Sequence, residues 1–292
     1  MTRSVFLSRL GSSIALWVVA LGIIFSGNEI GYFLLISSVS LLGLWEFYLM
    51  LDHKNLPNFK VTAMICAAIF LIGSFYYFRQ PGDPAHSYDF EMAVILGFLL
   101  VVFSRQMFEN MRSVWPLETM AYTLFGLLYV MWLFNFITKI VYVTPRGPHG
   151  EITGHFYVLY LIVVTKFSDM GAYVTGSLIG KHQLVPHISP KKTWEGFFGA
   201  LAFSTAGSFG LVWIAGPHLG YIHWHDAAIL GVLLGFAAII GDLAESLVKR
   251  ATEMKDSGGV LPGIGGVLDL IDSLLFTAPL LYFYMRLVIK VS

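Results

Sequence analysis

The feature that most constrains this chain is a succession of long apolar runs separated by short polar segments. Nine such runs occur, and each is close to the roughly 20 residues that a helix needs to cross a bilayer. In lipid the backbone must satisfy its own hydrogen bonds, which favours helices. We therefore predict an all-α, polytopic transmembrane helical bundle of about nine spans. The runs are 12–26, 30–50, 61–78, 90–104, 117–138, 156–179, 194–215, 226–244 and 267–288.

The composition agrees with this class and excludes others. Hydrophobic residues make up 57% of the 292 residues and charged residues 12%, and the mean hydropathy is +0.73. Eighteen Lys and Arg balance eighteen Asp and Glu, so the chain lacks the basic surface that a nucleic-acid partner needs. The single cysteine, Cys66, excludes an intramolecular disulfide and a thiolate metal cluster.

The distribution of cations predicts the orientation in the membrane. The first run follows Arg3 and Arg9 but lacks a cleavage pattern, so we interpret it as a retained span rather than a secretory signal. Nine spans place twelve Lys and Arg on one side and five on the other, with Lys166 inside a span. The positive-inside rule then puts the N-terminus and the loops 180–193 and 245–266 on the cytoplasmic face.

The domain organisation is predicted to be simple. No internal repeat, low-complexity tract or long polar linker divides the sequence. We therefore expect one membrane domain over residues 1–292, with N-terminal spans in 1–150 and C-terminal spans carrying the active site in 156–292.

The densest polar segment of the apolar regions is 241–250. If the helix of the eighth run continues through it, a carboxylate, a hydroxyl and two cations align on one face. The alternative is a helix end that exposes its cations at the interface, with Glu245 and Lys249 as an ordinary i,i+4 pair. The aligned residues are Asp242, Ser246, Lys249 and Arg250.

A glycine-rich segment follows, with five glycines within residues 258–266. Glycine permits positive φ and a close approach of backbone amides to an anion, and the segment leads into the last apolar helix, whose first amides favour phosphate. A structural turn could use the same glycines. The segment is not a P-loop, because Gly-Lys-Ser/Thr is absent.

Two aspartates, Asp269 and Asp272, are three residues apart at the start of that last run. Two carboxylates on one side of a helix at the membrane boundary repel one another unless a cation lies between them. Oxygen ligands without nearby histidine or thiolate indicate Mg²⁺. Asp242 and Asp256 are candidates to complete the cluster. The alternative is that both aspartates only cap the helix and favour its dipole.

A second polar patch lies between the sixth and seventh runs. Lys191 and Lys192 are natural phosphate partners, although they equally suit topology signals or lipid headgroup contacts. Ser189 or Thr193 is expected to cap the next helix, with Pro190 near its first turn and Glu195 at its positive end. Further upstream, Asp169 with Lys166 is either a self-satisfied pair or a functional intramembrane site.

The C-terminal residues resemble the signature of the phosphatidate cytidylyltransferase family, S-x-x-K-R-x-x-x-x-K-D-x-x-x-x-x-P-G-H-G-G-x-x-D-R-x-D. Ile264 and Leu270 depart from it, since the family commonly has histidine and arginine there. The segments 169–173 and 189–196 are similar to upstream motifs of the family. The matching residues are Ser246, Lys249, Arg250, Lys255, Asp256, Pro262, Gly263, Gly265, Gly266, Asp269 and Asp272.

This resemblance implies an enzyme of a bacterial inner membrane that condenses CTP with phosphatidate to give CDP-diacylglycerol and pyrophosphate. It also implies Mg²⁺, as one or two ions, and it leaves a homodimer open. We expect catalytic roles for Asp242, Ser246, Lys249, Lys255 and Asp256, substrate binding by Ser189, Lys191, Lys192, Thr193, Arg250, Gly263, Gly265 and Gly266, and metal ligation by Asp242, Asp269, Asp272 and Asp169.

Other functions fit parts of the pattern. A polyprenol kinase would also use CTP and a membrane acceptor. An ion-coupled transporter would place Asp169, Asp242 and Asp272 deep in the bilayer. The sequence instead places Asp242, Asp269 and Asp272 at the predicted cytoplasmic ends of the last two spans. The aspartate-rich signature of CDP-alcohol phosphotransferases is absent. The changes at Ile264 and Leu270 leave an inactive family member as a further alternative.

Overall fold

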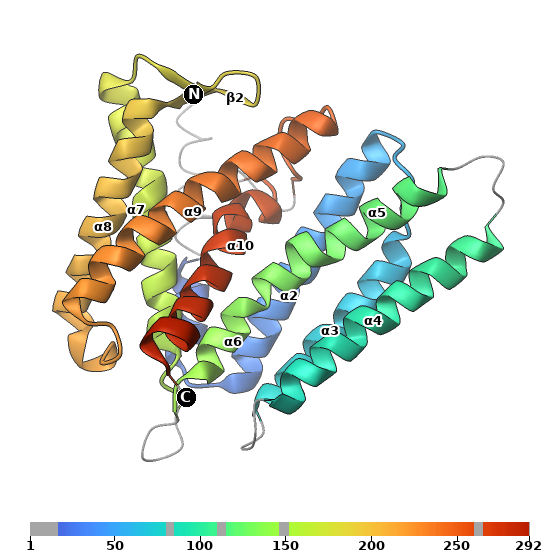
Figure 1. The fold of residues 1–292 in the computed structure, drawn as a ribbon, viewed down its shortest axis with the longest axis horizontal. Helices are drawn as coiled ribbons and strands as arrows, with labels where there is room; N and C mark the ends of the chain where they lie inside the picture. The colour runs from blue at the N-terminus through green and yellow to red at the C-terminus, as the bar shows by residue number, and fades with distance from the viewer. Residues whose placement is uncertain (1–16, 80–84, 110–114, 146–151, 260–264, 292) are drawn as a thin grey trace. The chain divides into compact units, whose positions relative to one another are not determined.

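The computed structural model describes residues 17–79, 85–109, 115–145, 152–259 and 265–291. Within these ranges, eight helical segments are long and apolar enough to cross a membrane. They correspond to the predicted runs from 30–50 onward, so the all-α, polytopic class is confirmed (Figure 1). Of the predicted first span, residues 17–25 are helical and residues 12–16 lie outside the described ranges. The cytoplasmic position of the N-terminus stays a prediction, as does a homodimer.

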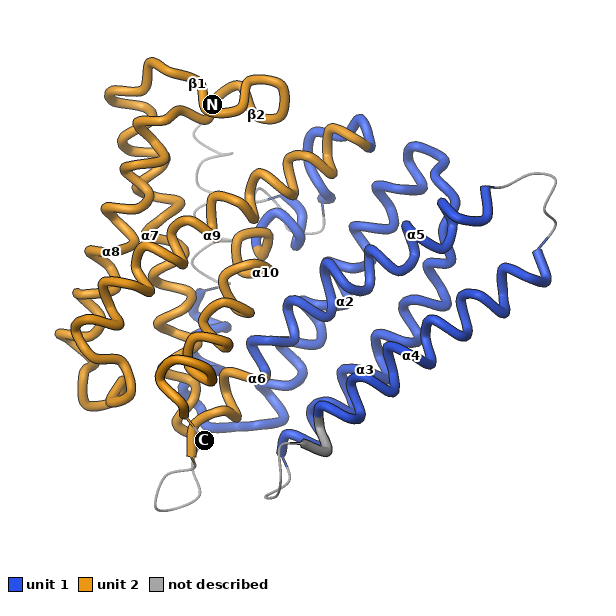
Figure 2. Tube along the Cα trace, in the orientation of Figure 1, with its two compact units in different colours: residues 1–138, 252–270 blue, residues 139–251, 271–292 orange. Residues whose placement is uncertain are grey.

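The chain divides into two compact units, which Figure 2 colours separately. Unit 1 comprises residues 1–138 and 252–270, and unit 2 comprises residues 139–251 and 271–292. The chain thus leaves unit 1, builds most of unit 2 and returns to unit 1 for the glycine-rich segment. The single domain expected from the sequence stays a prediction.

Unit 1 is built from helices whose buried faces are aromatic and aliphatic. Tyr48 is fully buried, and its hydroxyl donates to the carbonyl of Thr123 at 2.6 Å. A second polar contact inside the bundle joins Asn135 Nδ2 to Glu91 Oε1 at 3.0 Å. The helices are α2 (Glu29–His53), α3 (Lys60–Arg79), α4 (Ala85–Phe108), α5 (Pro116–Gly126) and the π-helical turn η1 (Leu127–Trp132), and α6 (Phe136–Val143) passes into unit 2.

Unit 2 is built from long helices that pack through small residues. Ser204 and Ser208 of α8 donate to the carbonyls of Gly231 and Ala227 of α9, at 2.8 and 2.7 Å. Such short side chains let backbones approach closely and supply hydrogen bonds between helices, as in membrane proteins generally. The elements are α7 (His155–Ile179), α8 (Trp194–Ala215), η2 (Gly216–His218), α9 (Trp224–Ala251) and η3 (Tyr284–Ile289), and α10 (Val267–Phe283) enters from unit 1 after Leu270.

A short antiparallel hairpin connects α7 to α8. It consists of β1 (Gln183–Val185) and β2 (Ser189–Thr193), with Gln183 opposite Thr193. The sequence did not predict these strands, and Pro190 lies in β2 rather than in the first turn of a helix. Thr193 caps α8 as predicted, because its side chain accepts from Gly196 N at 3.1 Å. The hairpin therefore brings Lys191 and Lys192 to the beginning of α8.

Candidate active site

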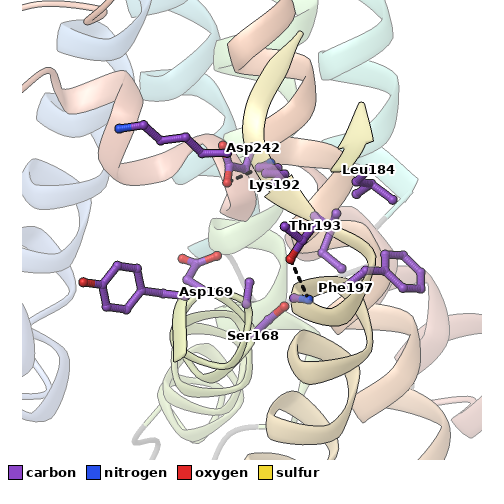
Figure 3. A pocket seen from close by; sticks show the side chains of 12 residues that line it. Ser168, Asp169, Leu184, Lys192, Thr193, Phe197 and Asp242 are labelled. Atoms are coloured by element: carbon purple, nitrogen blue, oxygen red, sulfur yellow. Dashed lines mark hydrogen bonds and ion pairs between the residues drawn. The ribbon is translucent and has the colours of Figure 1, made fainter. Parts of the chain in front are cut away.

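A pocket of about 220 Å³ lies in unit 2, between α7, the hairpin, α8 and α9. Its wall combines acidic, basic, hydroxyl and apolar groups. Figure 3 shows Asp169 and Ser168 on one side and Asp242, Lys192 and Thr193 on the other. The structure therefore brings together five residues that the sequence predicted for the site, from three separate parts of the chain. These residues are Asp169, Lys191, Lys192, Thr193 and Asp242.

The central charged contact of the pocket joins the hairpin to α9. Lys192 Nζ lies 2.9 Å from Asp242 Oδ2, and the two side chains are 21% and 42% exposed. Asp242 comes directly after Gly241, and a Cβ at Gly241 would lie 2.6 Å from the backbone oxygen of Asp272. The close approach of α10 to α9 at this glycine sets Asp242 beside the segment that carries Asp272.

Two further carboxylates lie near Asp242 in unit 2. Asp169 accepts from Lys166 Nζ at 3.0 Å and from Ser273 Oγ at 3.4 Å. Asp272 is only 7% exposed, and it interacts electrostatically with Asp242, Asp169 and Lys166. A buried carboxylate beside two others is unfavourable unless cations offset the repulsion, so this part of unit 2 is suited to attract a cation.

The donor chemistry of this cluster agrees with magnesium, although the described part of the chain holds no arrangement of three His, Cys, Asp or Glu side chains that could bind a metal ion by itself. Magnesium usually takes one or two carboxylates and shares its remaining positions between waters and substrate phosphates. Three oxygen donors in one neighbourhood of unit 2, two of them now held by lysines, therefore fit an ion that a phosphate helps to bind.

The polar face of α9 continues beyond the pocket, as predicted. Lys249 Nζ lies 2.5 Å from Glu245 Oε2, which is the ordinary i,i+4 pair that the sequence left open. Arg250 Nε donates to the carbonyl of Ile188 at 3.2 Å, so it ties the end of α9 to the tip of the hairpin. Ser246 is half-buried on the same helix, and Ser189 begins β2.

The hairpin is also fixed from α8. Glu195 Oε1 lies 2.7 Å from His182 Nδ1, and Glu195 Oε2 accepts from the backbone N–H of Lys181 and His182 at 3.1 and 3.3 Å. The sequence predicted Glu195 only as a charge at the positive end of the helix. Its additional role is to hold the chain that leads into β1.

Asp269 lies in unit 1, with the glycine-rich segment. Its Oδ2 accepts from Gly266 N at 2.9 Å and from Ser257 N at 3.3 Å. Gly265 has a φ of +117°, which confirms that the segment uses a conformation that glycine permits. Asp269 thus caps the first turn of α10, which was the alternative to metal binding, and this capping does not exclude a second role for its carboxylate.

The other predicted residues of this segment are partly described. Lys255 and Asp256 are exposed in unit 1. Pro262, Gly263 and Ile264 lie outside the described residues. The roles of all these residues stay predictions.

Glu46 was not among the residues predicted from the sequence. This residue of α2 is 0% exposed, and its Oε2 accepts from the backbone N–H of Leu268 at 2.8 Å, within unit 1. A signal for it existed, because an ionisable residue inside an apolar run is expensive in a membrane and is a functional candidate by default.

Comparisons with known proteins assign the chain to a family. The sequence model of the Cytidylyltransferase family matches residues 7–288. The chain is 30% identical over 280 residues to Phosphatidate cytidylyltransferase of Synechocystis sp., covering 88% of each chain. It is 27% identical over 287 residues to Phosphatidate cytidylyltransferase of Bacillus subtilis, covering 98% of each.

A further relative matches a shorter region. Uncharacterized protein YnbB of Escherichia coli is 36% identical over 164 residues, which are 56% of this chain and 50% of that protein. Because the family match runs over nearly the full length of the chain, the resemblance seen in the C-terminal signature extends to the N-terminal spans. The chain therefore belongs to the cytidylyltransferase family.

Proposed function

We propose that this multi-pass membrane protein is a phosphatidate cytidylyltransferase, which condenses CTP with phosphatidate to form CDP-diacylglycerol and pyrophosphate. The observation that carries the proposal is the pocket of unit 2, which Asp169, Asp242 and Lys192 line together, in a chain whose relatives of matching length bear that name. A site with carboxylates and lysines side by side suits a reaction between two phosphates, because both the metal and the phosphate charge need partners.

The reaction requires an in-line displacement at phosphorus. An oxygen of the phosphatidate phosphate attacks the α-phosphorus of CTP and forms the new P–O bond. The bond from the α-phosphorus to the oxygen that bridges to the β-phosphorus breaks, and pyrophosphate leaves with that oxygen. No covalent intermediate with the protein is needed. Lys191 and Lys192 would bind the triphosphate and neutralise the charge that accumulates on the leaving group.

The proposed metal ligands are Asp242, Asp272 and Asp169, which lie in one neighbourhood of unit 2. We include Asp269 on the basis of the signature motif. Bound magnesium, as one or two ions, would stabilise charge on the reacting phosphates. Before substrate arrives, Lys166 and Ser273 hold Asp169 in place and Lys192 holds Asp242.

The remaining assignments follow the signature and the local geometry. Arg250 would contact phosphate from the end of α9, close to the hairpin tip that it holds. We propose that the site opens to the cytoplasm, where CTP is available, and that the acyl chains of phosphatidate stay in the lipid. Supporting phosphate contacts are proposed for Ser189, Thr193, Ser246, Lys249, Lys255, Gly263, Gly265 and Gly266, with Asp256 assisting catalysis.

The test is an assay of the purified protein in detergent. CTP is supplied with phosphatidate, with a polyprenol or with no acceptor, each with and without Mg²⁺, and both pyrophosphate and CDP are measured. We expect pyrophosphate and CDP-diacylglycerol only when phosphatidate and Mg²⁺ are both present. Release of CDP with polyprenol would identify a kinase instead, and no lipid-dependent product under any condition would refute the proposal.

A further inference from the structure

The first turn of α10 is capped in an unusual way. The first amide groups of a helix have no acceptor within the helix, and a Ser, Thr, Asp or Asn side chain at the preceding residue commonly accepts from one of them. In α10 the preceding residue is Gly266, which has no side chain. Asp269 reaches back to Gly266 N at 2.9 Å, which is one half of a capping box. The other half must come from elsewhere in the chain.

Two other segments of unit 1 supply it. Glu46 Oε2 of α2 accepts from Leu268 N at 2.8 Å, and Ser257 Oγ accepts from Asp269 N at 3.2 Å. An N-cap side chain ordinarily accepts from the N–H of the second or third residue of a helix. In α10 both of these N–H groups, of Leu268 and Asp269, therefore have an acceptor. The cap of α10 is assembled from α2, the segment before the glycines and the helix itself.

The glycines on either side of residues 260–264 make room for this carboxylate. A Cβ at Gly266 would lie 2.7 Å from Glu46 Oε2 and 2.8 Å from Gly258 N, and a Cβ at Gly258 would overlap Glu46 Oε1. Glu46 itself is fully buried. The carboxylate thus contacts both ends of the glycine-rich segment and the turn that carries Asp269.

From this geometry we infer that Glu46 is a positioning residue, which holds the first turn of α10 so that the carboxylate of Asp269 is correctly aimed. The inference rests on the proposed function insofar as Asp269 takes part in binding magnesium. Glu46 acts through the backbone of Leu268 and does not need to touch substrate. Since its role is to accept an N–H bond, a neutral amide oxygen at the same place can perform it.

The experiment compares Glu46→Leu with Glu46→Gln. Leucine fills a similar volume without an acceptor, whereas glutamine retains one. The matched control is Glu91→Leu, which makes the same change at another buried carboxylate of unit 1, one that accepts from Asn135. For each variant we would measure kcat, the Mg²⁺ concentration for half-maximal activity, and hydrogen–deuterium exchange of peptides that cover residues 257–270.

We expect Glu46→Leu to lower kcat and raise the Mg²⁺ requirement by about tenfold or more, as for other groups that orient a metal ligand. Glu46→Gln should recover most of this loss. Glu91→Leu should leave the Mg²⁺ requirement unchanged, whatever it does to stability. Exchange in 257–270 should accelerate in Glu46→Leu alone. An unchanged Mg²⁺ requirement in Glu46→Leu, or the same shift in Glu91→Leu, would overturn the inference.

The exchange measurement separates this inference from the proposed function. If the unaltered protein shows no lipid-dependent release of pyrophosphate, the proposed function fails, yet faster exchange in Glu46→Leu with normal exchange in Glu46→Gln would still support the capping role. Equal exchange in all proteins would refute that role independently of any activity.

Discussion

The ammonium group of Lys192 lies 2.9 Å from the carboxylate of Asp242 and thereby occupies an oxygen that we propose as a metal ligand. The contact joins the hairpin to α9 on one side of the pocket (Figure 3). If Asp242 binds the metal as we propose, Lys192 and the metal ion compete for the same carboxylate in the absence of substrate. On this proposal, the phosphates of CTP would pair with Lys192 when CTP binds and would release Asp242 for the metal.

This competition predicts opposite effects of Lys192→Met on two ligands. Without the ammonium group, Mg²⁺ should reach half-maximal activation at a lower concentration, because Asp242 is no longer paired. The KM for CTP should rise by about tenfold, since a charge-assisted contact to phosphate is lost. Steady-state assays in which Mg²⁺ and CTP are varied separately would measure the Mg²⁺ concentration for half-maximal activation and the KM for CTP. The control is Lys181→Met, which makes the same change at an exposed lysine and should leave both values unchanged. A rise in both the Mg²⁺ requirement and the KM for CTP would contradict a competition between Lys192 and the metal ion for Asp242.

Asp272→Asn should abolish most activity and leave the fold intact. The change removes a charge from a group that is 7% exposed and lies near two other carboxylates, so repulsion falls and the protein should unfold at the same or a higher temperature without Mg²⁺. Activity should fall by about a hundredfold or more. Added Mg²⁺ should raise the unfolding temperature of the unaltered protein but not of the variant.

A control for this variant is Asp226→Asn. Asp226 is also buried in unit 2, where it accepts from Tyr284 Oη at 2.9 Å, and asparagine can still accept that bond. This control should keep both its activity and its stabilisation by Mg²⁺. Normal activity of Asp272→Asn would show that Asp272 is not a ligand.

Gly241→Ala should separate α10 from α9. The added Cβ would lie 2.6 Å from the backbone oxygen of Asp272 and 2.8 Å from Ser273 Cα, and backbone atoms cannot move aside as a side chain can. We expect a loss of about 1–3 kcal/mol in the free energy of unfolding, together with a higher Mg²⁺ requirement. The control Gly210→Ala adds the same methyl group in α8, where nothing lies within 4 Å. Thermal unfolding in detergent would measure the stability of the two variants, and activity assays at varied Mg²⁺ would measure their Mg²⁺ requirement. Equal stability of the two variants would be inconsistent with the close approach of α10 to α9.

Thr193 combines a structural and a proposed binding role, and two substitutions can divide them. Thr193→Ala should lose about 1 kcal/mol of stability because α8 loses its N-cap. Thr193→Asn restores an acceptor for Gly196 N and should recover that stability. If the hydroxyl also donates to phosphate, Thr193→Ala should raise the KM for CTP as well. The KM should then remain raised in Thr193→Asn, which lacks the hydroxyl, and should equal that of the unaltered protein in Thr193→Ser. Full recovery of KM by asparagine would leave capping as the only role of Thr193.

The sequence predicted best what depends on local periodicity. The spans could be placed because an apolar run of about 20 residues has one favourable environment. The pair Glu245–Lys249 was one of two alternatives offered by the sequence, and Thr193 was one of two candidate caps, since in each contact the partners are three or four positions apart. The hairpin was missed because its strands are three and five residues long and carry no alternation of apolar and polar residues.

What could not be predicted are contacts between distant segments. Lys192 and Asp242 are both visible as charged residues, yet nothing in the sequence indicates that they pair with each other. Glu46 lies within an apolar run, and nothing in that run indicates its contact with Leu268. The signature motif indicated the residues that we propose for the chemistry, whereas the contacts of Glu46 and Ser257 with the first turn of α10 became apparent only from the three-dimensional structure.

The bond between Glu46 and Leu268 spans 222 residues of sequence, and this separation has a consequence for biosynthesis. The helix that carries Glu46 is made early, while its partner leaves the ribosome only when the chain is nearly complete. During this interval the carboxyl group of Glu46 lies in an apolar helix, and the backbone N–H of Leu268 that will donate to it has not yet been synthesised. A nascent or prematurely terminated chain that ends before Leu268 would therefore keep an ionisable group within an apolar helix without this hydrogen bond, which is costly in a membrane.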